Sequence, residues 1–142
     1  MGDLSEHFNH SDFKCRCDLC RGEEFRIHLG LVGALEMIAE HFNKEVMIGS
    51  AYWCEKYYDS LKRNAKSYHT SGKAAHIRVE GAPLTELFKF AETIPGVFGL
   101  GFYPKENFIH IDTRPEEKKE QWVKEGEAYL PLTQDKRRQY GL

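Results

Sequence analysis

The chain has 142 residues, of which 41% are hydrophobic and 30% are charged. This length and composition predict a single domain with its own hydrophobic core. Lysine and arginine total 20 against 22 acidic residues, and this net charge of -2 argues against a nucleic-acid-binding protein, because that class usually carries a basic excess. No apolar run approaches the roughly 20 residues of a membrane-spanning helix, and the polar N-terminal segment lacks the apolar core of a signal peptide. We therefore expect no nucleic-acid partner, no membrane segment and, by default, a cytoplasmic monomer.

Residues 1–22 read as an irregular N-terminal arm, in which Leu4, Phe8 and Phe13 are expected to pack against the body of the domain. From residue 23 the pattern changes. Apolar residues recur at steps of three and four up to Asn43, which predicts an amphipathic helix over residues 23–43.

Two further helices are predicted by the same criterion. The segment AYWCEKYYDSLKRNA, residues 51–65, has helical spacing of its large apolar side chains. After Pro83, which suits the first turn of a helix, an apolar stripe continues to Ile94, and Pro95 with Gly96 ends it.

Four segments have the character of strands. Residues 45–50 are short and rich in valine and isoleucine, and residues 74–80 alternate between two faces. Residues 97–103 and 107–112 are separated by the turn 104–106, which predicts a β-hairpin.

The C-terminal region is highly charged. We expect a helical stretch over residues 116–124 and a loosely held extension over residues 127–142. The predicted organisation is thus an arm (1–22), a domain (23–114) and a charged extension (115–142). The order helix, strand, helix, strand, helix, hairpin predicts an α+β domain with a mainly antiparallel sheet covered by helices on one side.

Three histidines stand out in these segments. His76 and His110 lie on predicted strands whose branched aliphatic residues occupy the opposite face, and His69 comes from the loop just before the first of those strands. Three imidazoles with a fourth position left to water are a known catalytic zinc arrangement. Asp112, two residues beyond His110 on the same face, is placed to orient that ring. Unrelated surface histidines are the alternative interpretation.

The cysteines offer a weaker metal hypothesis. Cys15, Cys17 and Cys20 are close enough in sequence to form a metal knuckle, with Cys54 or a histidine as fourth ligand. A structural zinc site would usually show two spaced pairs, and without a secretion signal the thiols are expected to be reduced. A zinc-knuckle or redox module is therefore the least favoured of the metal hypotheses.

The blocks SYHTSGKAAHI and GLGFYPKENFIHIDTR resemble the M15 zinc peptidases, specifically their D-alanyl-D-alanine carboxypeptidase-like group, subfamily A. That family shows Ser-x-His-x-x-Gly-x-Ala-x-Asp-Ile, then Gly-x-Gly-x-Tyr and Phe-x-His-x-Asp. The matching residues are Ser67, His69, Gly72, Lys73, Ala74, Ala75, Ile77, Gly99, Gly101, Tyr103, Phe108, His110, Asp112 and Arg114. The opening SEHFNHSDFKCRC is also similar, so the resemblance runs from about Leu4 to Arg114.

The resemblance implies a fold shared with the hedgehog signalling domain and D-Ala-D-Ala peptidases, and peptidoglycan stem peptides as substrate. It also implies one zinc ion held by His69, His76 and His110. Candidate catalytic residues are Glu106 and Asp112.

Ser67, Trp53 and Tyr103 are the candidate contacts to substrate. Two positions depart from the family pattern: His76 stands where the family has an aspartate ligand, and Trp53 stands where relatives carry an arginine suited to a substrate carboxylate or the reacting oxygen.

Two functions follow from these features. The chain is expected to be a zinc peptidase of the carboxypeptidase or endopeptidase type. Because it shows no signal peptide, a phage lysis or tail system would have to deliver it to the cell wall. The alternative is a degenerate, non-catalytic member of the fold that binds zinc or a wall peptide.

Overall fold

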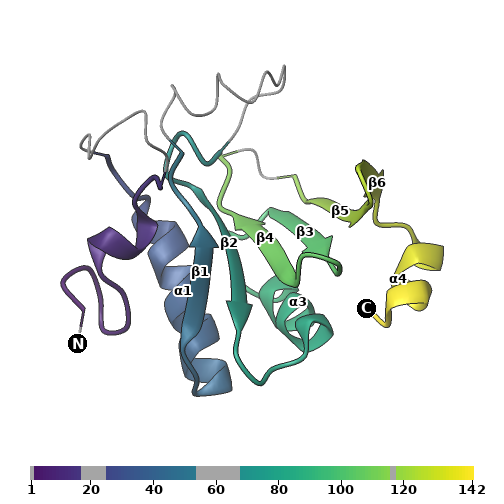
Figure 1. Ribbon diagram of the computed structural model, residues 1–142, viewed down its shortest axis with the longest axis horizontal. Helices are drawn as coiled ribbons and strands as arrows, with labels where there is room; N and C mark the ends of the chain where they lie inside the picture. The colour runs from purple at the N-terminus through teal and green to yellow at the C-terminus, as the bar shows by residue number, and fades with distance from the viewer. Residues whose placement is uncertain (1, 17–24, 54–67, 116–117) are drawn as a thin grey trace.

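The computed structural model describes residues 2–16, 25–53, 68–115 and 118–142. A short 3-10 helix, η1, opens the chain and short strands and helices follow (Figure 1). The elements are η1 (His10–Phe13), α1 (Leu29–Phe42), β1 (Val46–Ser50), β2 (Ala74–Val79), α3 (Leu84–Glu92), β3 (Gly99–Tyr103), β4 (Phe108–Asp112), β5 (Glu120–Glu125), β6 (Ala128–Pro131) and α4 (Gln134–Tyr140).

The strands form one six-stranded sheet in the order β1-β2-β4-β3-β5-β6. All neighbouring strands are antiparallel except β3 and β5, which are parallel. The hairpin β3–β4 lies in the middle of the sheet, and its tight turn is aided by Asn107, which has a positive φ. This arrangement confirms the predicted α+β fold with a mainly antiparallel sheet.

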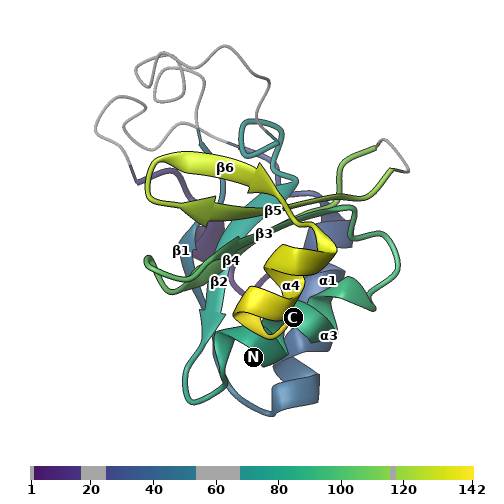
Figure 2. The same ribbon diagram turned by 90° about the vertical axis from the view of Figure 1, so that its right-hand side faces the viewer.

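The helices gather on one face of the sheet (Figure 2). The apolar residues of β2 and β4, Ala75, Ile77, Ile109 and Ile111, are fully buried on that face together with the apolar stripes of α1 and α3. Helix α4 reaches the same side, since Tyr140 packs on Phe102 of β3. The other face therefore carries the alternate residues of β2 and β4, which include His76 and His110. No helix in the described part of the chain is long and apolar enough to cross a bilayer.

Most of the predicted elements are present with small changes in their ends. The arm packs as expected, with Phe8 and Phe13 buried and Leu4 partly buried against the core. The first helix is shorter than predicted, because it begins at Leu29 and residues 25–28 are not helical. His28 caps it in an extended conformation: its backbone N–H donates to the Gly72 carbonyl, and its ring is hydrogen-bonded to Thr113. Both contacts come from distant sequence, so local periodicity did not reveal this boundary.

The prediction for the C-terminal region is wrong in two respects. Residues 120–125 form strand β5 instead of a helix, because the free edge of β3 supplies backbone partners and Val123 becomes fully buried. Residues 127–142 are not loosely held, since β6 pairs with β5, and α4 carries Tyr140 and the adjacent Leu142 onto the core. Tertiary pairing thus outweighs the helix propensity of a Glu/Lys-rich segment. The helix predicted over residues 51–65 falls almost wholly outside the described residues.

Candidate metal centre

Two of the three histidines are direct neighbours across the sheet. His76 of β2 pairs with His110 of β4, and His110 in turn pairs with Gly101 of β3. The row continues to Trp122, which pairs with Gly101 from the parallel strand β5. Period-two alternation places all four residues on the face away from the helices. Two imidazoles and an indole therefore lie in one row across the sheet, with Gly101 between His110 and Trp122.

His69 completes the group from the turn that precedes β2. Its Nδ1 atom lies 2.6 Å from the carbonyl oxygen of Ala51, so Nδ1 carries a proton and donates it, and Nε2 is left with its lone pair. The turn depends on Gly72, whose φ is +72°, and a Cβ there would lie 2.1 Å from the Arg26 carbonyl oxygen. His69 is buried, with 3% of its surface exposed.

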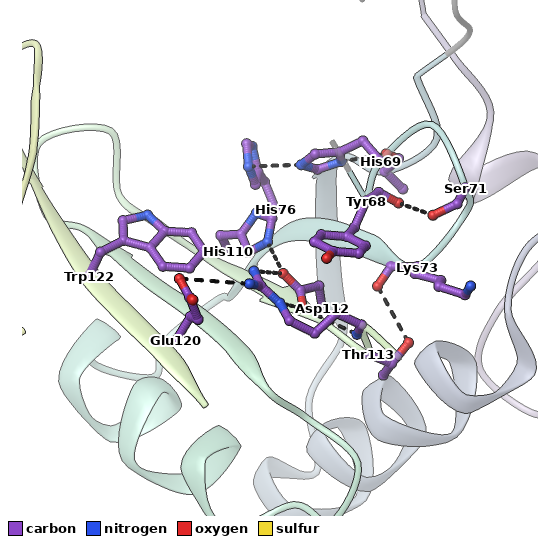
Figure 3. Close-up of polar contacts among 12 residues, drawn as sticks. Tyr68, His69, Ser71, Lys73, His76, His110, Asp112, Thr113, Glu120 and Trp122 are labelled. Carbon is purple, nitrogen blue, oxygen red and sulfur yellow. Dashed lines mark hydrogen bonds and ion pairs between the residues drawn. The ribbon is translucent and has the colours of Figure 1, made fainter. Parts of the chain in front are cut away.

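The donor atoms of these histidines fit a single metal ion. One nitrogen from each of His69, His76 and His110 lies within 4.8 Å of the others (Figure 3). The Nε2 atoms of His69 and His76 are 3.2 Å apart. Two nitrogens bound to one tetrahedral zinc ion at 2.0–2.1 Å would be about 3.3 Å apart. The residues present therefore match the donor type that zinc requires, and the pair His69–His76 also matches the spacing.

His110 is held by a buried carboxylate. Its Nε2 atom lies 2.7 Å from Oδ2 of the fully buried Asp112, which leaves Nδ1 for a metal ion. Arg114 donates from Nε and Nη2 to the two oxygens of the same carboxylate, at 2.8 Å each. Burial alone would raise the pKa of Asp112, but the hydrogen bonds from Arg114 and His110 outweigh it and hold that pKa well below its usual range. A charged Asp112 fixes the ring orientation and tautomer of His110.

The two glycines of β3 leave the space that this arrangement needs. A Cβ at Gly99 would lie 2.0 Å from Oδ2 of Asp112, and a Cβ at Gly101 would lie 2.5 Å from Nε1 of Trp122. Both glycines face the site side of the sheet. The Gly-x-Gly spacing therefore admits a buried carboxylate and an indole beside the histidines.

Aromatic rings line the histidine cluster. Trp53 stacks on His69 with ring centroids 3.9 Å apart, and Phe108 stacks on His76 at 4.4 Å. Tyr103 stacks on Phe108 and accepts a hydrogen bond from Nε1 of Trp122 at 3.2 Å. Trp122 also packs beside His110, with 5.0 Å between ring centroids. Packed rings of this kind restrict the rotamers of the imidazoles they touch.

The remaining predicted residues divide into three groups. Trp53, Tyr103 and Asp112 lie in or beside the cluster. Glu106 lies in the β3–β4 turn, and its carboxylate forms an ion pair with Lys124, which lowers its pKa. Ser67, Cys17, Cys20 and Cys54 fall outside the described residues; Cys15 is half-buried and belongs to no metal-ligating group in the described part of the chain.

Comparison with known proteins finds a family match that covers the histidine cluster. A profile of the family described as Peptidase M15 matches residues 6–112, more than half of the chain. The chain belongs to the M15 family of peptidases. The match runs from the N-terminal arm to the end of β4 and contains all three histidines and Asp112. Residues 113–142, with β5, β6 and α4, lie beyond it.

Two curated relatives are similar over a shorter stretch. The peptidoglycan L,D-endopeptidase MepK of Escherichia coli strain K12 is 46% identical over 50 residues, 35% of this chain and 27% of MepK. A probable peptidoglycan L,D-endopeptidase MepK of Haemophilus influenzae is 47% identical over 49 residues, 34% of this chain and 26% of that protein. The matched stretch thus spans about a quarter of the length of these two relatives.

Sequence reasoning missed Trp122 as a neighbour of the site and gave no role to Arg114. Trp122 lies in residues 116–124, whose charged pattern predicts a helix, whereas the structure has strand β5 from Glu120 to Glu125. The signal that was present is the pair of glycines at alternate positions of β3, since glycine on a strand face indicates a bulky neighbour from an adjacent strand.

Proposed function

We propose that this M15 chain is a zinc-dependent peptidase that hydrolyses peptide bonds in peptidoglycan, and that it acts as an endopeptidase. The observation that carries the proposal is the cluster of His69, His76 and His110, whose ring nitrogens gather within 4.8 Å inside the family-matched region. The similarity to two peptidoglycan L,D-endopeptidases supports the substrate class and the type of cleavage.

The three histidines would hold the ion, His69 and His76 through Nε2 and His110 through Nδ1. When bound, zinc polarises a carbonyl group and lowers the pKa of water to about 7, which is the chemistry that peptide hydrolysis needs. Asp112 keeps the proton of His110 on Nε2, and Arg114 keeps Asp112 charged. The residue at position 76 supplies a neutral imidazole in place of the family's aspartate, which makes the site more positive by one charge.

The endopeptidase assignment also follows from position 53. A carboxypeptidase must bind the C-terminal carboxylate of its substrate, and a cation is the natural partner for it. In this chain Trp53 stands at the position where the family pattern has an arginine, and its ring stacks on His69. Arg114 lies two residues beyond Asp112, and its guanidinium is already bound to that carboxylate. An internal peptide bond has no terminal carboxylate to bind and fits this site better.

Proton transfer is assigned to Glu106, with Asp112 in an orienting role. The carboxylate of Asp112 is hydrogen-bonded to both His110 and Arg114. Its proposed role is therefore to orient the His110 ring and not to transfer a proton itself. The hydrogen bond from Lys124 lowers the pKa of Glu106 and so makes it a weaker base. Ser67, Trp53 and Tyr103 are proposed to contact the substrate.

A second candidate function is a non-catalytic module that binds zinc or a wall peptide. It is favoured by the engagement of both candidate carboxylates with cations, Glu106 with Lys124 and Asp112 with Arg114. The two candidates differ in what restoring the family pattern does. If the chain is degenerate, the double variant His76→Asp, Trp53→Arg gains hydrolysis that the wild type lacks.

The deciding experiment is incubation of the zinc-loaded chain with defined muropeptides, followed by mass spectrometry. We expect cleavage of an internal peptide bond without release of a terminal D-alanine, and no cleavage by His110→Ala. Release of D-alanine would show that the chain is a carboxypeptidase and not an endopeptidase. No turnover of monomeric or cross-linked muropeptides by zinc-replete protein would refute catalysis and leave the binding module.

A further inference from the structure

We propose that Trp122, from the segment beyond the family match, is a positioning residue of the metal centre that holds the imidazoles of His110 and His76 in their ligating orientation. The inference rests on the proposed metal centre and adds the C-terminal ribbon β5–β6 to it. The family match ends at residue 112, so nothing in that match assigns a role to this strand.

The position of Trp122 follows from strand register. Strand β5 runs parallel to β3, and Trp122 pairs with Gly101, which itself pairs with His110. Gly101 has no side chain, so the indole lies over its backbone and reaches the imidazole two strands away. Trp122 and His110 have ring centroids 5.0 Å apart and an interplanar angle of 49° (Figure 3).

The contact adds a restraint that Asp112 cannot supply alone. The hydrogen bond from Nε2 of His110 to Asp112 fixes one atom of the ring. Because the ring is also attached at Cγ, this hydrogen bond still lets it rotate about the line from Cγ to Nε2, whereas packing against its side limits that rotation. The carboxylate and Trp122 together define where Nδ1 points.

The second restraint passes through Tyr103 to His76. Nε1 of Trp122 donates to the Tyr103 hydroxyl at 3.2 Å, and Tyr103 stacks on Phe108 at 4.5 Å. Phe108 in turn stacks on His76 at 4.4 Å. Trp122 is therefore in contact with one proposed ligand directly and with a second through two stacked rings.

Arg114 joins the indole to the buried carboxylate. Its guanidinium lies 6.0 Å from the centre of the Trp122 ring while it binds both oxygens of Asp112. Loss of the indole would expose one side of this cation to water and loosen its hold on the carboxylate. Contacts around a metal ligand typically change affinity by about 10–100-fold when they are removed.

Two variants approach this contact from opposite sides. Trp122→Leu removes the indole and leaves Gly101 intact. Gly101→Ala leaves the indole but adds a Cβ that would lie 2.5 Å from its Nε1 atom and 2.7 Å from Cε1 of Tyr103, so both rings must move. The φ of Gly101 is not in the left-handed region, so alanine is not strained there by its backbone. We expect both variants to weaken zinc binding by about 10–100-fold.

Two controls separate positioning from stability. Gln121→Ala alters the neighbouring residue of β5, whose amide donates to Glu92 of α3, so it loosens the ribbon without touching the site face. Gly33→Ala repeats the glycine substitution on α1, where an added Cβ meets nothing within 4 Å. Zinc affinity of both controls should stay within about twofold of wild type.

Zinc binding is measured by calorimetric titration of the metal-stripped 142-residue chain. The visible spectrum of the cobalt-substituted form and the thermal midpoint of the metal-free form are measured beside it. Support requires weaker zinc binding and an altered cobalt spectrum in Trp122→Leu and Gly101→Ala, with Trp122→Phe nearer to wild type. Wild-type zinc affinity in both variants would overturn the inference and leave the proposed function standing. Failure of the wild type itself to bind zinc would overturn both. If Gln121→Ala loses as much zinc affinity as Trp122→Leu and Gly101→Ala, the ribbon β5–β6 affects the site only through the stability of the fold, and the inference fails.

Discussion

The two halves of the sheet are held together by different forces. Strands β1, β2, β4 and β3 bury nearly all their helix-facing residues against α1 and α3, whereas Val123 is the one fully buried residue in the described segment 118–142. Apart from strand pairing and a few partly buried apolar residues such as Tyr140, that segment is held by ion pairs, among them those of Lys124 with Glu106, Lys136 with Glu125 and Arg137 with Glu92. The histidines stand on the apolar half, and Trp122 reaches them from the charged half. The difference predicts that the two halves respond differently to mutation, salt and pH.

The largest expected effect lies in the apolar half. Phe88 of α3 is fully buried and packs edge-on against Phe102 of β3. Phe88→Ala should reduce the free energy of unfolding by about 3–5 kcal/mol, because it removes a buried ring and leaves a cavity. Urea denaturation followed by circular dichroism measures this loss. The neighbouring exposed residue provides the control: Lys89→Ala should change it by less than about 0.5 kcal/mol.

The next effect concerns the buried carboxylate of Asp112 at the end of β4. Asp112→Asn should weaken zinc binding by about 10–100-fold, since asparagine neither fixes the tautomer of His110 nor balances the charge of Arg114. Calorimetric titration of metal-stripped protein measures the change. Unchanged zinc affinity in this variant would show that the 2.7 Å contact between His110 and Asp112 does not orient the ligand.

A smaller and salt-dependent effect is expected in the charged half. Arg137 binds both oxygens of Glu92 and also the side chain of Gln121, and both partners of the ion pair are partly buried. Arg137→Ala should cost about 1 kcal/mol of unfolding free energy at low salt and less in concentrated salt. Arg138 is the control, because its side chain is 80% exposed and its contact to Asp135 is 3.8 Å long. A loss that is equal at both salt concentrations would contradict an electrostatic tie.

The smallest effect is a pH dependence of the N-terminal arm. The hydrogen bond with Glu36 raises the pKa of His7 above its ordinary value of 6.5, so its stabilising contribution is complete below that value and is lost as pH rises through the raised pKa. Burial raises the pKa of Glu36, but the hydrogen bonds from Ser5 and His7 lower it overall, so its contribution is lost only at acid pH.

The variant His7→Ala tests this pairing. Its thermal midpoint should differ from that of wild type more at about pH 5.5 than at about pH 8.5. Equal differences at the two pH values would show that the imidazole charge does not hold the arm.

The same contrast between the halves explains which parts of the fold could be predicted. Strands β2 and β4 were predictable because burial of one face forces Ile77 and Ile109 to alternate with His76 and His110. Strand β5 was not, since its residues are mostly polar and its place beside β3 depends on an open sheet edge. The start of α1 was missed for a related reason: the contacts of His28 come from Gly72 and Thr113, far along the chain.

The candidate site was predictable to a similar extent. The three histidines and Asp112 followed from alternation and from the resemblance to M15 peptidases. The stacking of Trp53 on His69, and the reach of Trp122 over Gly101, depend on side-chain packing between distant segments. A single sequence does not encode such packing in any local pattern.

The most direct test of the account is the coordination of zinc in the metal-loaded chain, measured by metal analysis and X-ray absorption spectroscopy. We predict one zinc ion per chain with three imidazole nitrogens at about 2.0–2.1 Å, and loss of that ion in His76→Ala and His110→Ala. Zinc bound with sulfur ligands at about 2.3 Å, or retained at wild-type level in both histidine variants, would contradict the assignment of the metal to the histidine cluster.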